Sequence, residues 1–123
     1  MKVLLLSLTI GFIFYNYSLA QDVTCEELVK YVEDEGYVKG TVTSIQLFNS
    51  SWLKEVKAYS IDNTIVVIAE VKKDEWGFNT EKYAFCGIPS SNWDAFYSGL
   101  YDLGKTYGEK FHKYIYNYNC NCN

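Results

Sequence analysis

The chain has 123 residues, with 11 lysines, no arginine and 15 acidic residues, so its formal net charge is −4. A chain of this length suits a single domain. Nucleic-acid binding relies on clustered lysine and arginine, so an acidic chain without arginine disfavours a nucleic-acid partner.

Residues 1–20 have the pattern of a secretory signal peptide. Lys2 gives a positive start, residues 3–14 are almost wholly apolar, and residues 18–20 (SLA) supply small side chains before a cleavage point. The apolar run is shorter than the roughly 20 residues that span a bilayer, and no cysteine directly follows the cleavage point. We therefore expect a released protein, secreted or periplasmic, with no stable membrane anchor after signal cleavage.

The first expected element of the mature chain is a helix over residues 25–35. Thr24 and Glu27 are spaced as a capping box, and Gly36 supplies a stop signal. Residues at helical spacing form one face that we expect to point to the core: Cys25, Leu28, Tyr31 and Val32.

A small antiparallel β-meander of three or four strands should follow. The expected strands are residues 37–47, as a short edge strand, and residues 54–61, 64–71 and 81–88. Asp62 and Asn63 both tolerate positive φ, so they predict a hairpin turn. Residues 65–69 are apolar on both faces, which is typical of an inner strand. On the last strand Tyr83 and Phe85 should point to the same face.

Two helices are expected after the sheet. Pro89 ends the last strand, and Ser91 and Asp94 are in capping-box register for a helix. The inward stripe of that helix would be Trp93, Phe96, Tyr97 and Leu100. The last helix, residues 109–118, would turn Phe111, Tyr114, Ile115 and Tyr118 inward. This order predicts an α+β fold in which helices cover one face of an antiparallel sheet, with the two C-terminal helices packed on that face.

The four cysteines are expected to form disulfides, because an even number in a small exported domain favours them. Neighbours spaced C-x-C rarely pair with each other. Cys25 and Cys86 should therefore each join one of Cys120 and Cys122, with the choice between the two pairings open. The alternative is a thiolate metal site with His112 as a further ligand. We favour disulfides and expect no metal and no other cofactor.

Four short motifs occur in a fixed order: SSWLKEV at residues 50–56, YAF at residues 83–85, Ile88-Pro89, and TYGEKFHKYI at residues 106–115. Together they resemble the KTSC domain, a family named for its place at the C-terminus of some lysyl-tRNA synthetases and also found as a stand-alone bacterial domain. The resemblance spans residues 45–118. Residues 21–44, with the first helix and a short strand, and the cysteine-containing tail at residues 119–123 lie outside it.

The chain departs from the family pattern at three positions. The family has a Tyr-x-Tyr centre and a Ser-x-Gly-x-x-Phe-Asn-x-x-Ile ending, where this chain has Phe85, Thr106 and His112 in place of the second Tyr, the Ser and the Asn. The resemblance implies a binding surface built from the residues at matching positions: Tyr83, Phe85, Gly108, Phe111 and His112. It also implies nucleic-acid binding as an alternative function, which the acidic charge disfavours.

Structural roles compete with functional ones for these residues. Tyr83 and Phe85 alternate on a strand, which is first of all a sheet-packing pattern. His112 lies about 100° from Phe111 on the expected helix, at the edge of the apolar stripe. There it could donate a hydrogen bond to a backbone carbonyl, and we favour that role over a chemical one.

Catalysis is the less favoured class of function. His112 could form an acid–base dyad with Asp102 or Glu109 in a small hydrolase. However, the chain has no nucleophile elbow, zinc-binding helix motif or phosphate-binding loop. No catalytic residue is therefore assigned.

The aromatic residues favour a binding function. The chain has 3 tryptophans and 12 tyrosines, and such side chains suit protein and glycan surfaces. Trp76 stands in a polar turn at residues 74–78 (DEWGF), so we expect it to be exposed. The sequence predicts a small exported binding or accessory domain that recognises a protein or glycan partner through exposed aromatics. An envelope protein that acts through assembly is a further alternative, and the ligand and the oligomeric state are not specified.

Overall fold

The computed structural model describes residues 23–98 and 102–122, and it confirms the predicted α+β fold. The predicted signal peptide, residues 1–20, lies outside the described residues, as does Leu100. The elements in chain order are α2 (Cys25–Glu35), β1 (Tyr37–Val42), β2 (Leu53–Ile61), β3 (Thr64–Lys72), β4 (Thr80–Cys86), α3 (Ser90–Tyr97) and α4 (Tyr107–Tyr114).

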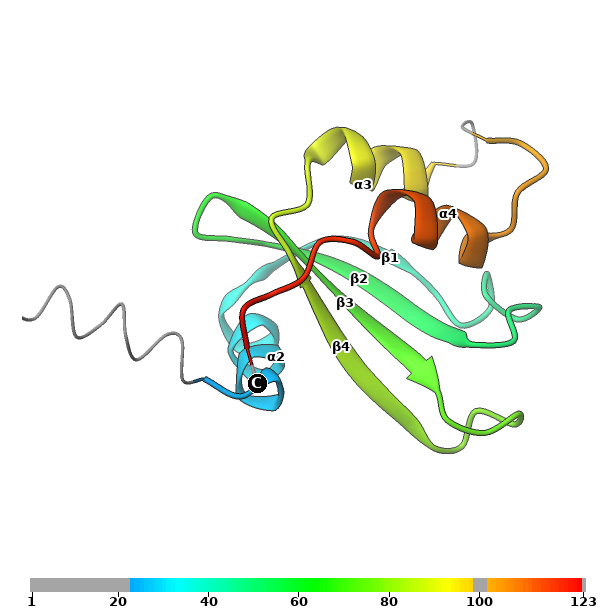
Figure 1. Cartoon of the computed structure of the whole chain (residues 1–123), viewed down its shortest axis with the longest axis horizontal. Coiled ribbons are helices and arrows are strands. Elements are labelled where there is room, and N and C mark those ends of the chain that lie inside the picture. The colour runs from blue at the N-terminus through cyan, green and yellow to red at the C-terminus, as the bar shows by residue number, and fades with distance from the viewer. Residues whose placement is uncertain (1–22, 99–101, 123) are drawn as a thin grey trace, which may run out of the picture.

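The four strands form one antiparallel sheet in the order β1-β2-β3-β4 (Figure 1). The predicted hairpin turn between β2 and β3 is confirmed, because Asp62 and Asn63 have φ values of 51° and 61°. Ile61 pairs with Thr64 to close this turn. The predicted inner strand is β3, which is paired on both sides.

Both faces of the sheet are covered by helices, which corrects the prediction that helices cover one face. Helices α3 and α4 lie together over one face, as predicted, whereas α2 packs on the opposite face (Figure 1). Alternation along β3 explains the difference, because Val67 and Ala69 point to α3 and α4 while Val66 and Ile68 point to α2. A strand that is apolar on both faces must be covered on both.

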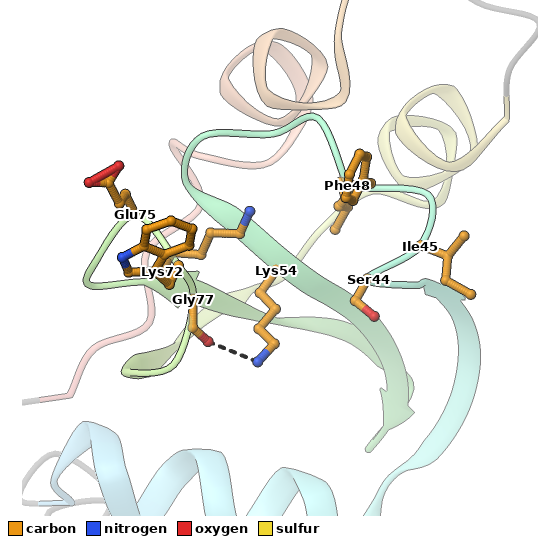
Figure 2. Close-up of a pocket in the computed structure, with 9 residues that line it drawn as sticks. Ser44, Ile45, Phe48, Lys54, Lys72, Glu75 and Gly77 are labelled. Carbon is orange, nitrogen blue, oxygen red and sulfur yellow. Dashed lines mark hydrogen bonds between the residues drawn. The ribbon is translucent and has the colours of Figure 1, made fainter.

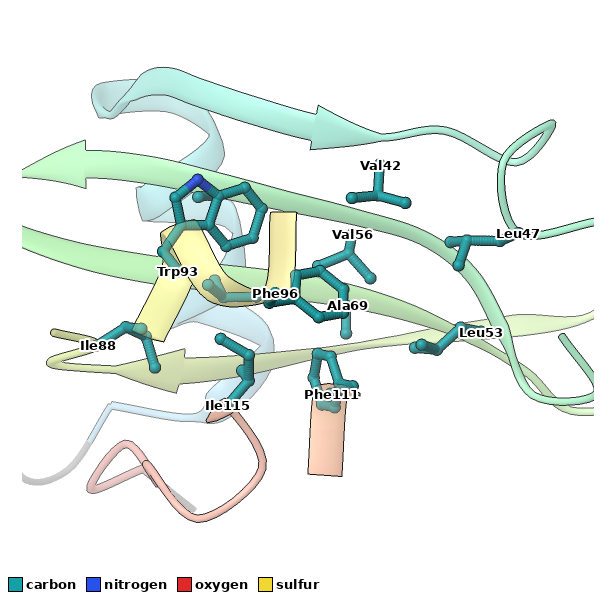
Figure 3. Packing of buried hydrophobic residues seen from close by; sticks show 12 residues of the cluster. Val42, Leu47, Leu53, Val56, Ala69, Ile88, Trp93, Phe96, Phe111 and Ile115 are labelled. Carbon is teal, nitrogen blue, oxygen red and sulfur yellow. The ribbon is translucent and has the colours of Figure 1, made fainter. Parts of the chain in front are cut away.

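The main core lies between the sheet and helices α3 and α4. Figure 3 shows large side chains from both layers meeting there, among them Trp93, Phe96 and Phe111 from the helices and Val56 and Ala69 from the sheet. These five side chains are almost wholly buried. At about 1.5–3 kcal/mol for each fully buried large apolar side chain, this layer supplies much of the driving force for folding.

The start of α2 was predicted correctly, whereas one of its core residues was not. Thr24 and Glu27 form the capping box, with Thr24 Oγ1 accepting from the Glu27 backbone N–H at 3.0 Å. Val29 is buried in place of Tyr31, which is exposed. Val32 and Leu28 belong to both the expected and the observed face, so the face that meets the sheet is rotated by only about 40° toward Val29.

The boundaries of the last two helices also differ from the prediction. α3 begins at Ser90 with Pro89 as its N-cap and without a side-chain cap, so the expected Ser91 capping box is wrong. Pro89, with extended backbone at ψ 140°, is the N-cap instead, so the helix starts two residues earlier than a cap at Ser91 would place it. α4 has a capping box at Thr106 and Glu109 that the sequence analysis missed, and it ends at Tyr114.

Two disulfides fasten the C-terminal tail. The bonds are Cys25–Cys122 and Cys86–Cys120, which confirms the predicted pattern and decides the pairing. The tail also lies against β4, where the Cys86 N–H donates to the Tyr118 carbonyl at 3.1 Å. The four sulfurs are joined in two pairs, so none is a free thiolate that could bind a metal. The disulfides indicate an oxidising, extracellular environment.

Among the described residues, none of the helices has the length and apolar character needed to cross a bilayer.

Candidate functional site

Two surfaces with exposed aromatic side chains stand out, and they have different chemistry. The first, which we call the loop surface, consists of Ile45, Phe48, Trp76 and Phe78, each between 75% and 85% exposed. The second, which we call the Trp52 groove, is a cavity of about 490 Å³. Its lining residues are Trp52, Val71, Tyr83, Phe85, Tyr116, Asn117 and Asn119.

The loop surface is built from two connections that project from the same end of the sheet. Ile45 and Phe48 belong to the connection between β1 and β2, and Trp76 and Phe78 to the connection between β3 and β4. A cavity of about 620 Å³ lies between the two connections. Figure 2 shows Ile45 and Phe48 on one side of this cavity and Glu75 on the other. The predicted exposure of Trp76 is confirmed.

One carboxylate organises the loop that carries Trp76. Asp74 Oδ1 accepts hydrogen bonds from the backbone N–H groups of Trp76, Gly77 and Phe78, at 3.1, 2.7 and 3.1 Å. Its Oδ2 accepts from the Asn79 backbone N–H at 3.1 Å and from the Asn79 side chain at 2.9 Å. Desolvation alone would raise the pKa of Asp74. The hydrogen bonds together lower it by more than desolvation raises it, so the pKa lies below the ordinary value. The aromatic side chains therefore project from a preformed turn.

Two lysines fasten the ends of the loop surface to the strands. Lys54 Nζ donates to the Gly77 carbonyl at 3.0 Å, a bond drawn in Figure 2. Lys72 Nζ donates to the Ser50 carbonyl at 2.7 Å. Both ammonium groups thus hold the loops in place.

Rings at the Trp52 groove, beside it and beneath it contact one another in a closed circuit. The Trp52 ring lies 5.2 Å from that of His112, and His112 lies 4.7 Å from Tyr116, measured between centroids. The circuit continues from Tyr116 to Phe85 at 6.2 Å and from Phe85 to Phe111 at 5.2 Å. Phe111 returns to Trp52 at 5.5 Å in an edge-to-face contact. Each ring is therefore held by two neighbours.

Gly108 allows Trp52 to approach α4 closely. A Cβ atom at position 108 would lie only 2.7 Å from Trp52 Nε1, well inside the usual carbon contact distance of about 3.5–4.0 Å. Only glycine therefore leaves room for the indole in its observed position. A second hollow, of about 390 Å³, lies on this side of Trp52.

The predicted site residues divide into three groups. Tyr83, Phe85 and His112 reach the surface around Trp52, whereas Phe111 is fully buried beneath it and Gly108 lies under the indole. Trp76 is part of the loop surface instead.

Five residues that line the groove were not predicted as site residues: Trp52, Val71, Tyr116, Asn117 and Asn119. The sequence holds a signal for two of them. Trp52 stands within the quoted SSWLKEV motif, and Tyr116 follows His112 at a spacing of four residues, which places their side chains on one helical face. These were the signals that could have found them.

His112 does not take the predicted capping role. Its ring is exposed and contacts Trp52 and Tyr116, and the described residues provide it with no hydrogen-bond partner. The proposed dyad partners are engaged elsewhere, since Asp102 binds Lys113 at 3.1 Å and also Tyr114. Glu109 accepts from the Thr106 backbone N–H at 2.8 Å. An acid–base dyad is therefore not assembled in this arrangement.

The hydrogen bond from Tyr114 lowers the pKa of Asp102 most, followed by that from Lys113. Both partners stabilise the carboxylate form, so this group is held ionised and is not poised to donate or accept a proton near neutral pH. Within residues 23–98 and 102–122, no group of three or more His, Cys, Asp or Glu side chains could hold a metal ion.

No protein-family model, curated protein or solved structure matches the chain. The resemblance to the KTSC domain therefore stays a prediction.

Proposed function

We propose that the chain is a small exported binding domain that recognises a protein partner through the loop surface. The observation that carries the proposal is the set of four large apolar side chains, each at least 75% exposed, at one end of the sheet. Three of these side chains, Ile45, Phe48 and Trp76, line one cavity, and exposed apolar groups gathered around a hollow with polar residues at its rim mark interaction sites. Tryptophan is also one of the residues enriched among binding hot spots.

The turn that carries Trp76 is already ordered, which supports a binding role for the loop surface. Asp74 fixes the backbone from Trp76 to Asn79 before any partner arrives. Ordering a loop on binding opposes association, so a loop that is already ordered binds more tightly for the same contacts. The Lys54 and Lys72 hydrogen bonds extend this rigidity to both connections.

The chemistry of the loop surface favours a protein over a glycan or a membrane. Ile45 and Phe48 are apolar side chains that offer no hydrogen bonds to sugar hydroxyls. Anionic membranes attract clustered basic residues, whereas Asp74 and Glu75 stand directly beside Trp76. A protein interface combines such an apolar centre with a polar rim.

Export and the KTSC resemblance belong to the same proposal. The two disulfides support export through a signal peptide at residues 1–20. The residues at family positions, Tyr83, Phe85, Gly108, Phe111 and His112, gather around Trp52 in the folded chain. Their proximity supports the proposal that residues 45–118 form a KTSC-like unit.

The test is a binding screen of the disulfide-bonded protein against a displayed library of protein fragments from the source genome, followed by affinity measurement. Trp76→Ala should weaken binding by about 30-fold or more, as for a hot-spot residue. Tyr37→Ala is the matched control, because Tyr37 is 81% exposed on β1, away from the loop surface. Its binding should equal that of the wild type.

Absence of any protein binder that depends on Trp76 would overturn the proposal. A glycan-array signal that is lost in Trp76→Ala would also overturn it, because it would assign the loop surface to a sugar.

A further inference from the structure

The Trp52 groove is a second exposed aromatic surface, and its lining differs from that of the loop surface. It lies on the α4 side of the sheet, where β4 supplies Tyr83 and Phe85 and the tail after α4 supplies Tyr116, Asn117 and Asn119. Its volume of about 490 Å³ is within the range of about 300–1,000 Å³ that is typical of small-molecule sites.

The rings of the groove form a rigid platform. Phe111 is fully buried and supports both Trp52 and Phe85 by edge-to-face contacts at 5.5 and 5.2 Å. Tyr83 and Tyr116 are exposed to solvent, with 43% and 49% of their surface accessible. A ligand with a flat apolar face could therefore stack on rings whose positions do not have to be reorganised.

The tail places side-chain amides beside these rings. Tyrosine and asparagine alternate from Tyr116 to Asn119, so the tail delivers both kinds of side chain to the groove. Asn117 and Asn119 have no side-chain hydrogen bond among the described residues, and each amide offers two donors and an acceptor. The bridge between Phe85 and Asn119 and the Cys86–Cys120 disulfide hold the tail in register.

The groove lining contains no charged side chain. A phosphate or carboxylate ligand would require a cation there, and a lipid tail would leave the amides unpaired. A neutral sugar matches the lining, because its C–H face stacks on rings while its hydroxyls exchange hydrogen bonds with amides and phenols. We propose that the Trp52 groove binds a neutral oligosaccharide, at a site separate from the loop surface.

The experiment is a titration of the isotope-labelled, disulfide-bonded protein with neutral oligosaccharides, observed through the tryptophan indole N–H signals in NMR spectra. The probes are trisaccharides of glucose, mannose, galactose and N-acetylglucosamine at about 10 mM, enough to saturate a site with a Kd of about 1 mM. At least one probe should shift the Trp52 signal and leave those of Trp76 and Trp93 in place.

Variants separate this proposal from the protein-binding one. Tyr116→Ala and Asn117→Ala, both at exposed positions, should each weaken sugar binding by about tenfold or more. Trp76→Ala should leave sugar binding unchanged. Thermal unfolding of each variant shows whether it is folded, and Asn117→Ala keeps the test valid if Tyr116→Ala is not.

Three results would overturn the proposal. The first is that none of the trisaccharides shifts the Trp52 signal. The second is a sugar-induced shift confined to Trp76. The third is binding of a single-stranded oligonucleotide in the groove, with an affinity that falls steeply with salt, which would assign the groove to nucleic acid.

Discussion

Replacement of Gly108 by alanine tests the contact that shapes the Trp52 groove. The new Cβ would meet Trp52 Nε1 at 2.7 Å, so the indole must retreat by about 1 Å to reach an ordinary contact distance. Trp52 is held between Phe111 and His112, and overpacking of this kind destabilises by about 1–3 kcal/mol. Alanine also favours the helix by about 0.5–1 kcal/mol relative to glycine. We expect a net destabilisation of up to about 2 kcal/mol.

The two opposing effects can be separated by a double-mutant cycle. In a Trp52→Ala background the clash is absent, so Gly108→Ala should stabilise the protein by about 0.5–1 kcal/mol. The free energy of unfolding is measured by guanidinium denaturation with the disulfides intact, followed by circular dichroism because the cycle removes a fluorophore. The expected coupling energy is about 1–3 kcal/mol. An equal effect of Gly108→Ala in both backgrounds would refute the close approach of Trp52 to α4.

Three further predictions concern one disulfide and two loops. Replacing Cys25 and Cys122 by serine opens a loop with a sequence separation of 97 and should lower the free energy of unfolding by about 4–5 kcal/mol in guanidinium denaturation, where a loss below about 1 kcal/mol would contradict the chain-entropy argument. Because the pKa of Asp74 is lowered in the folded loop, its stabilisation is present above the ordinary aspartate pKa and is lost as the pH falls through the lower folded value. Fluorine NMR of a fluorinated Trp76 should therefore show loop loosening only below the ordinary aspartate range, and loosening between pH 5 and 7 would be inconsistent with this. Asn63→Gly should stabilise the protein by up to about 1 kcal/mol in thermal unfolding, since glycine accepts φ of 61° without strain, whereas a destabilisation would argue against the observed turn.

The predicted fold was close to the observed one because its signals are local. Thr24 and Glu27 act through three residues of chain, and Asp62 and Asn63 select their turn through their own backbone preferences. The wrong choice of Tyr31 as a core residue of α2 arose because local signals do not decide it. Helical periodicity groups Tyr31 with Val32, but the choice between Tyr31 and Val29 depends on how the helix rests on Val66 and its neighbours, which lie far along the chain.

The candidate sites were predicted less completely. The exposure of Trp76 follows from the polar residues around it, but the role of Asp74 depends on the geometry of the turn that it closes. Trp52 was expected as part of a motif and as one of three tryptophans, but not as a site residue. Its importance appears when β4 and α4 bring Phe85 and Phe111 against it.

The amino-acid sequence by itself determined the order and type of the elements, the inner strand and the pattern of tail disulfides, because these depend on neighbouring residues and on simple steric limits. The tertiary structure alone decided which cysteines pair, which face α2 covers and how the Trp52 groove is assembled. Cys25 bonds to Cys122 across a separation of 97 residues, and the groove joins Trp52 to Asn119. Such contacts are selected by the packing of the whole chain, since no short stretch contains both partners.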